Sequence, residues 1–215
     1  IMTVTAKIIG YDGKNMVVVP DVLVDRELIQ KQINRVEIRL NDGRTITADQ
    51  RRKAYATLRD IADYSGHEPE YLKEWFKYEY MIKTGGEYFS LSDCSVTVAR
   101  EYINVLVDFC LRHGVPLYEP MTERTDDIGA YLYMCLYYRK CAVCGRAADV
   151  HHVTGSKLGM GADREKSHHL GREAIALCRK HHNIAHTNEN DFFKENHIYG
   201  IKLDETLCER LNLRK

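Results

Sequence analysis

The chain has 215 residues, of which 44% are hydrophobic and 29% are charged, and its formal net charge is zero. These values are ordinary for a globular protein with one large domain or two small ones. No apolar run reaches the roughly 18 residues of a membrane span, and the N-terminus lacks a basic stretch followed by an apolar core. We therefore expect neither a membrane segment nor a signal peptide, and we find no internal repeat or low-complexity segment.

The first forty residues have the alternation of β-strands. Apolar residues alternate over Val4–Ile9 and again over 36–40, and Met16–Val19 is a short apolar run. Asp42-Gly43 is a typical hairpin turn, which predicts a return strand over Arg44–Thr47.

Three helices are predicted next. The first begins at a cap residue, Thr47 or Asp49, and ends at Gly66, with Ala54, Leu58, Ile61 and Ala62 on its apolar face. The second begins near Pro69 and runs to about Met81. The third is capped by Ser92 or Ser95 and ends at Gly114.

The polar stretch 118–127 is the best candidate for a linker, because it contains Pro120 and has no apolar periodicity. A tyrosine-rich helix over 128–138 follows. We therefore predict an N-terminal domain over residues 2–120 and a C-terminal domain over 121–215.

The cysteines fall into two groups. Four of the seven are scattered among apolar residues, which is typical of buried thiols in a reducing cytoplasm: Cys94, Cys110, Cys135 and Cys208. The other three belong to two matched pairs, Cys141-x2-Cys144 and Cys178-x2-His181, with 33 residues between the pairs. Two pairs at this spacing predict a tetrahedral structural zinc site of three cysteines and one histidine.

Seven of the ten histidines lie between residues 151 and 186. His151 and His152 are adjacent on a predicted strand, so their rings should point to opposite faces and have different roles. His182 and His186 are four residues apart on a predicted helix, so their rings should share one face and could share a metal ion. The segment 139–186 also has nine Lys or Arg against four Asp or Glu, an excess typical of phosphate-binding surfaces.

Taken together, Cys141-x2-Cys144, Asp149-Val-His151-His152-Val153 and Leu177-Cys178-x2-His181-His182-x3-His186 resemble the HNH endonuclease superfamily, in a form found in tailed phages. The resemblance covers about 46 residues and implies a ββα-metal fold.

Carried over, this resemblance makes His151, His182 and His186 ligands of a catalytic Mg²⁺, Mn²⁺ or Ni²⁺ ion, and it makes His152 the general base. Glu173 stands where the family has its loop-bracing Asn. In the Gly-rich loop between the histidine pairs, Lys157 and Arg164 are candidate phosphate contacts or simply exposed residues. We interpret His168 and His169 as surface or structural residues, with alternative metal ligands or phosphate contacts as the other options.

Residues 35–118 resemble the NinB/Orf family of phage recombination mediators, through Gln50-Arg51-Arg52-Lys53, the aromatic segment 71–80 and the segment 89–95. This resemblance implies binding of single-stranded DNA and cooperation with the host single-strand-binding protein. Arg51, Arg52 and Lys53 could contact phosphates, although a charge run is usually a solvated face. Tyr71, Leu72, Trp75 and Phe76 recur at helical spacing, which favours core packing over base stacking.

We therefore expect an α+β chain in which a mixed strand and helix domain precedes a small ββα-metal domain held by zinc. The predicted function is that of a phage recombination protein, in the host cytoplasm, that binds single-stranded or branched DNA and carries a metal-dependent HNH endonuclease. Two alternatives stay open: a DNA-binding mediator with a catalytically silent zinc module, and a stand-alone nuclease of packaging or restriction type. A homo-oligomer is a further expectation.

Overall fold

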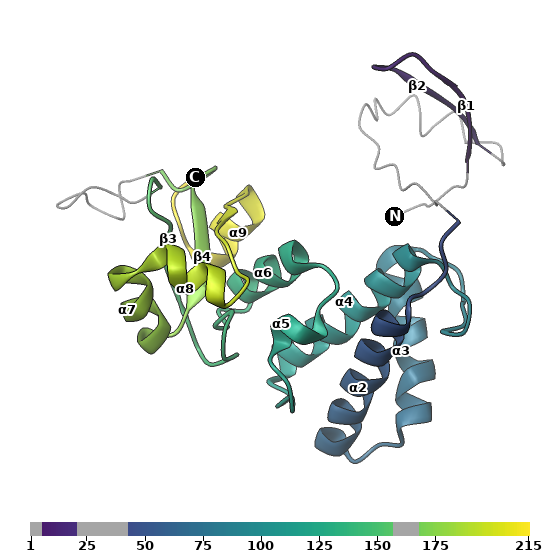
Figure 1. The fold of residues 1–215 in the computed structure, drawn as a ribbon, viewed down its shortest axis with the longest axis horizontal. Coiled ribbons are helices and arrows are strands. Elements are labelled where there is room, and N and C mark those ends of the chain that lie inside the picture. Colours follow the sequence, from purple (N-terminus) through teal and green to yellow (C-terminus); the bar gives the residue numbers. More distant parts are fainter. Residues whose placement is uncertain (1–5, 21–42, 157–167) are drawn as a thin grey trace.

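The computed structural model describes residues 6–20, 43–156 and 168–215 (Figure 1). Within residues 6–137 the described ranges contain a hairpin and five helices: β1 (Ala6–Tyr11), β2 (Met16–Pro20), α2 (Ala48–Ser65), α3 (Pro69–Thr84), α4 (Val96–His113), α5 (Met121–Arg124) and α6 (Ile128–Tyr137). After residue 137, the described residues form a three-stranded sheet and three helices: β3 (Asp149–His152), β4 (Glu173–Leu177), α7 (Arg179–Thr187), α8 (Glu189–Glu195), β5 (Ile201–Lys202) and α9 (Glu205–Leu211). This mixture confirms the α+β class. None of the helices in the described ranges has the length and hydrophobicity needed to span a bilayer.

The ends of the long helices follow from local sequence. Thr47 and Gln50 form a reciprocal capping box at the start of α2, with both hydrogen bonds at 3.1 Å. Ser95 caps α4 by accepting from the Val98 backbone N–H. Each of α2, α3 and α4 ends at a glycine with φ near +70°, a conformation that other residues adopt at a steric cost: Gly66, Gly85 and Gly114. The predicted positions of all three helices are confirmed.

The predicted return strand over Arg44–Thr47 is wrong. Thr45 makes a single isolated bridge with Ser95, and the Ile46 N–H donates to the Cys94 carbonyl at 2.7 Å. The segment therefore contacts the residues at the start of α4 instead of forming a strand. Burial of the Ile46 side chain stabilises this position. The partner strand expected over 36–40 lies outside the described residues.

The aromatic stripe on α3 divides between core and surface. Leu72 and Phe76 are buried, whereas Tyr71 is 57% exposed and Trp75 is 38% exposed. The edge of Trp75 packs against Phe76 and Phe109. The expectation of core packing thus holds for the inner half of the stripe, and the outer half faces solvent.

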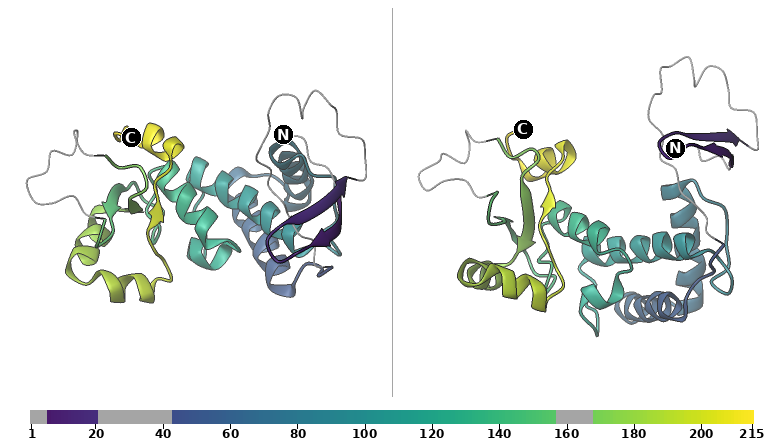
Figure 2. Two further views of the ribbon diagram at one scale, coloured as in Figure 1. Left: turned by 90° about the horizontal axis from the view of Figure 1, so that it is seen from above. Right: turned by 45° about the horizontal axis from the view of Figure 1, so that its top comes forward.

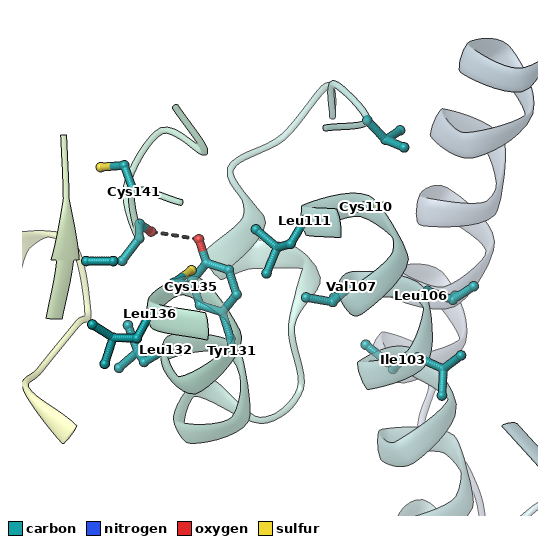
Figure 3. Packing of buried hydrophobic residues seen from close by; sticks show 14 of the residues in the cluster. Ile103, Leu106, Val107, Cys110, Leu111, Tyr131, Leu132, Cys135, Leu136 and Cys141 are labelled. Atoms are coloured by element: carbon teal, nitrogen blue, oxygen red, sulfur yellow. Dashed lines mark hydrogen bonds between the residues drawn. The ribbon is translucent and has the colours of Figure 1, made fainter. Parts of the chain in front are cut away.

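Helix α6 joins the two parts of the molecule. Four of its side chains have no solvent exposure: Tyr131, Leu132, Cys135 and Leu136. The helix packs against α4 on one side and against β4 on the other. Figure 3 shows the α4 and α6 side chains meeting, with the Tyr131 hydroxyl donating to the Ala142 carbonyl at 2.8 Å. The described buried apolar residues therefore form one continuous cluster that spans both parts of the chain.

The stretch 118–127 is packed rather than extended. It contains α5, and its Arg124 side chain is only 4% exposed. The Arg124 guanidinium lies 3.0 Å from the Asp60 carboxylate on α2 and 3.1 Å from Glu119. This stretch is therefore not an unstructured linker. The domain boundary near residue 120 stays a prediction.

The second part is built around an antiparallel sheet in the order β3-β4-β5. β4 is buried over Ala174–Leu177, and α7 begins directly after it. Figures 1 and 2 show α7 and α8 at one end of the molecule and α2 and α3 at the other. This arrangement separates the sheet with its histidines from the long helices.

The buried pair between Arg124 and Asp60 yields the first test. Removing one partner of a buried ion pair leaves the other charge uncompensated, so Arg124→Ala should lower the free energy of unfolding by about 3–5 kcal/mol. Arg100→Ala is the matched control, because the Arg100 side chain that pairs with Asp126 is 44% exposed, and its loss should cost about 1 kcal/mol or less. Urea denaturation followed by circular dichroism measures both, and equal losses would contradict the structural role of Arg124.

Candidate functional site

Four potential metal ligands from the two sequence pairs meet at one point. The ligand atoms of Cys141, Cys144, Cys178 and His181 all lie within 4.8 Å of one another. The Sγ atoms of Cys144 and Cys178 are 3.7 Å apart, and His181 Nδ1 is 3.2 Å from Cys141 Sγ and 3.4 Å from Cys178 Sγ. The sulfur atoms are too far apart for a disulfide bond.

A tight turn and a helix start aim these ligands. The Gly145 N–H donates to the Cys141 carbonyl at 2.8 Å, and Gly145 has a φ of 67°, which favours glycine directly after the second cysteine. Cys178 is the N-cap of α7, so His181 lies in the first turn of the helix. The Ala142 N–H donates to the Ala176 carbonyl at 2.9 Å and so ties the turn to β4.

The donor set of this cluster fits zinc. With Zn–S near 2.3 Å and Zn–N near 2.0 Å, tetrahedral ligands would lie about 3.5–3.8 Å apart, close to the spacings found here. Burial raises the pKa of the Cys141 thiol to about 11, which a cation would have to offset. Burial also acts on Cys144, but hydrogen bonds from Arg146 outweigh it and lower the pKa of that thiol. Arg146 thus favours the thiolate that a metal ligand requires.

A second cluster contains three histidines. The candidate ligand atoms of His151, His182 and His186 lie within 4.8 Å of one another, with ring centroids 4.7–4.9 Å apart. His151 comes from β3, and the other two come from one face of α7. Burial, followed by the charges of the other two rings, lowers the pKa of His182 to about 4, so this ring is neutral at pH 7. Its Nδ1 is buried without a hydrogen-bond partner among the described residues, as a nitrogen awaiting a cation would be.

Glu189 supports this cluster, and the sequence reasoning missed it. Its Oε1 is 2.9 Å from His151 Nε2, and its Oε2 accepts from the Thr154 N–H at 2.8 Å. Both Glu189 and the His151 side chain are buried. A carboxylate bound to one ring nitrogen orients an imidazole, so Nδ1 is the candidate metal-ligand atom of His151. A glutamate one turn beyond the spaced pair His182 and His186 is the signal that could have found it.

His152 faces the other side of β3, as expected from strand alternation. It is half-buried, and its Nε2 lies 2.9 Å from Nδ1 of His169, a residue that is 1% exposed. The pairing of His152 with Ala174 on the buried strand β4 sets this orientation. His168, by contrast, is exposed and contacts the Lys215 carbonyl.

The loop after β3 is braced without the family's asparagine. The Glu173 N–H donates to Ser156 Oγ at 3.1 Å, and the Glu173 carbonyl accepts from the Val153 N–H at 3.1 Å. Arg172 Nη1 donates to the Ser156 carbonyl at 3.1 Å. Backbone groups of Glu173 and the side chains of Ser156 and Arg172 therefore hold the described part of this loop.

Three of the candidate nucleic-acid residues lie far from the histidines. Arg51, Arg52 and Lys53 lie on α2, at the opposite end of the molecule from α7 (Figures 1 and 2). Arg51 donates to the Leu91 and Ser92 carbonyls, and Arg52 and Lys53 each contact the Asp49 carboxylate. Lys157 and Arg164 lie outside the described residues.

A basic cavity of about 240 Å³ lies beside Arg51. Its lining contains three cations, two serine hydroxyl groups, a tyrosine and a leucine: Arg51, Lys73, Lys77, Ser90, Ser92, Tyr55 and Leu91. The Glu70 and Glu74 carboxylates pair with the lysines and offset part of the positive charge. Sequence reasoning found Arg51 but not the two lysines, because only the folding of α3 against α2 brings them together.

Comparison with known protein families shows what the chain is similar to. A family model with the description "Putative HNHc nuclease" matches residues 21–214, which includes both the helical part and the histidine clusters. No curated protein and no solved structure shows a significant match to the chain.

The cysteine cluster predicts one tightly bound zinc ion per chain in protein purified without added metal. Because a structural zinc site contributes folding energy directly, Cys144→Ser should lose the zinc and unfold the segment around α7. Cys94→Ser, at a cysteine outside the cluster, should keep the full zinc content. Elemental analysis and circular dichroism measure both effects, and a folded wild-type protein without zinc would refute the assignment.

Proposed function

The chain belongs to the HNHc nuclease family, and on this premise we propose that it is a metal-dependent endonuclease that hydrolyses phosphodiester bonds in DNA. Membership in a nuclease family implies a DNA substrate. The observation that carries the proposal is the position of His152 on β3, directly beside His151 but on the opposite face from the three-histidine cluster. This geometry provides a metal site and a potential base on adjacent residues.

His151, His182 and His186 would hold the catalytic ion. The ion would supply a positive charge that polarises a non-bridging phosphate oxygen and stabilises the leaving 3′ oxygen. Three imidazole nitrogens form a donor set that suits Ni²⁺ better than Mg²⁺ or Mn²⁺, which prefer oxygen ligands. Among the expected ions, we therefore favour Ni²⁺.

His152 is the residue to which we assign proton transfer. A neutral imidazole accepts a proton from water, and the resulting hydroxide attacks phosphorus in line with the 3′ oxygen. The P–O3′ bond breaks, which leaves a 5′-phosphate and a 3′-hydroxyl end after the 3′ oxygen takes up a proton. Glu189 keeps His151 oriented throughout, because its carboxylate holds the nitrogen that faces away from the cluster.

A catalytically silent zinc module is the less favoured alternative. A module used only for recognition would need the Cys141 cluster but not a second, adjacent cluster of three histidines. This second cluster favours an active nuclease.

The proposal predicts different losses at two histidines. His152→Ala should lower the cleavage rate by about 10²–10⁴-fold, because a positioned base is lost, while binding of Mn²⁺ at the second site stays nearly unchanged. His182→Ala should lose both cleavage and this second metal site. Plasmid cleavage with Mn²⁺, Ni²⁺ or Mg²⁺ and calorimetric titration of the ion measure the two effects.

His67→Ala is the control, because His67 lies on the surface between α2 and α3. The His67→Ala protein should cleave DNA at the wild-type rate. Wild-type cleavage rates in the His152→Ala protein would show that the base is another residue. Failure of the wild-type protein to cut any DNA with any of these ions would favour the silent module.

We propose, second, that the basic cavity beside Arg51 binds the phosphate backbone of DNA. It combines cations with serine hydroxyl groups, and the exposed Tyr55 ring on its wall could stack on a base. This feature is what supports a preference for single-stranded or branched DNA. A phage recombination role, a host single-strand-binding partner and a homo-oligomer stay predictions of the sequence.

Lys73 is the cation to test, because it lines the cavity and its side chain is 18% exposed. Lys73→Ala should weaken binding of single-stranded DNA several-fold and reduce the slope of log affinity against log salt by about 1. Lys83→Ala on the same helix should leave affinity unchanged, since Lys83 pairs with Asp108 away from the cavity. Fluorescence anisotropy at several salt concentrations measures both, and equal affinities would reject this site without affecting the nuclease proposal.

A further inference from the structure

The imidazole of His169 is in direct contact with the residue to which we assign proton transfer. His152 Nε2 and His169 Nδ1 are 2.9 Å apart, and the two rings are tilted by 49°. Since the contact is between two nitrogens, one ring donates a hydrogen and the other accepts it. The two residues are separated by 17 positions in the chain, so the contact is a product of the fold.

The backbone around His169 is held on both sides. Its N–H donates to the Arg214 carbonyl at 2.9 Å, and its carbonyl accepts from the Arg172 N–H at 3.0 Å. Arg172 also donates to the His168 and Ser156 carbonyls. His169 is only 1% exposed, so the surrounding residues restrict the movement of its side chain. These contacts hold the imidazole at a defined position next to His152.

We propose that His169 is a positioning residue that sets the tautomer and orientation of His152, an inference that rests on the proposed nuclease function. If His152 is to accept a proton at Nδ1, its Nε2 must carry the hydrogen and donate it to His169 Nδ1. After proton transfer, His152 is an imidazolium, and the same hydrogen bond becomes charge-assisted and stronger. His169 therefore does for this base what a carboxylate or a carbonyl does for other catalytic histidines.

The opposite direction of the hydrogen bond would disable the base. If His169 Nδ1 were the donor, His152 would accept at Nε2 and would carry its hydrogen on Nδ1, where it could not take a proton from water. The contact by itself permits either tautomer of His152, and the proposed positioning role requires His169 Nδ1 to be the acceptor. Only the tautomer with hydrogen on Nε2 is compatible with the assigned role.

Three substitutions of His169 separate positioning from packing. His169→Phe keeps an aromatic ring in the buried site but removes the acceptor, so kcat should fall by about 10²-fold with little change in KM. His169→Asn places an amide oxygen near the position of Nδ1 and should recover most of the lost rate. His169→Gln has a longer side chain that places its amide nearer the position of Nε2, and it should not recover the rate.

His168→Ala is the matched control, because His168 is adjacent and exposed, and it should cleave like the wild-type protein. Zinc content and melting temperature are measured for every variant to exclude unfolding. A His169→Phe protein with normal kcat, or a His169→Asn protein as slow as His169→Phe, would overturn the proposal.

The tautomer provides a readout that does not depend on cleavage. Long-range ¹H–¹⁵N NMR spectra of the histidine side chains should show hydrogen on Nε2 of His152 in the wild-type protein and in His169→Asn. In His169→Phe the two tautomers should mix. Hydrogen on Nδ1 of wild-type His152 would refute the positioning role. If the wild-type protein does not cleave DNA but the Nε2 tautomer is present, the nuclease function fails while the contact between the two histidines retains its role in setting the tautomer.

Discussion

The antiparallel pairing of β3 with β4 decides which way each histidine of the pair 151–152 faces. β4 is buried, and His151 and His152 pair with Ile175 and Ala174 on it. Because alternate strand residues point to opposite faces, a shift of one residue in this register would exchange the two rings. Each ring would then lose its present partners, because the two faces differ. One face has a buried carboxylate and two imidazoles, and the other has a single imidazole.

The cysteine cluster lies at the C-terminal end of β4, where it connects this strand to the helix that carries His182 and His186. Cys178 follows this strand directly and caps α7, and His181 occupies the first turn, immediately before His182. Binding of zinc would therefore fix the position and rotation of the helix that carries two of the three histidines. If both ions bind as proposed, the structural ion and the catalytic ion would be coupled through about two turns of α7, so that loss of the first would also disturb the second.

The long helices contribute through α6, which packs against both α4 and β4. Since the described core is continuous across this helix, the helical part and the sheet do not have separate hydrophobic cores. One family model also covers both parts of the chain. These observations favour a protein in which the helical part and the sheet form one structural unit.

Much of this protein could be predicted from the sequence alone, for local reasons. Capping residues and glycines determined the ends of α2, α3 and α4, and short-range spacing identified the pairs Cys141-x2-Cys144 and Cys178-x2-His181. Tertiary structure decided the rest. Glu189 and His169 acquire their partners only because strands, helices and loops distant in sequence come together, and sequence spacing alone does not identify those partners. Likewise, Arg51 looked like a free cation in the sequence, but folding directs its guanidinium to the Leu91 and Ser92 carbonyls, because a partly buried charge is stabilised by acceptors that only the packed chain supplies.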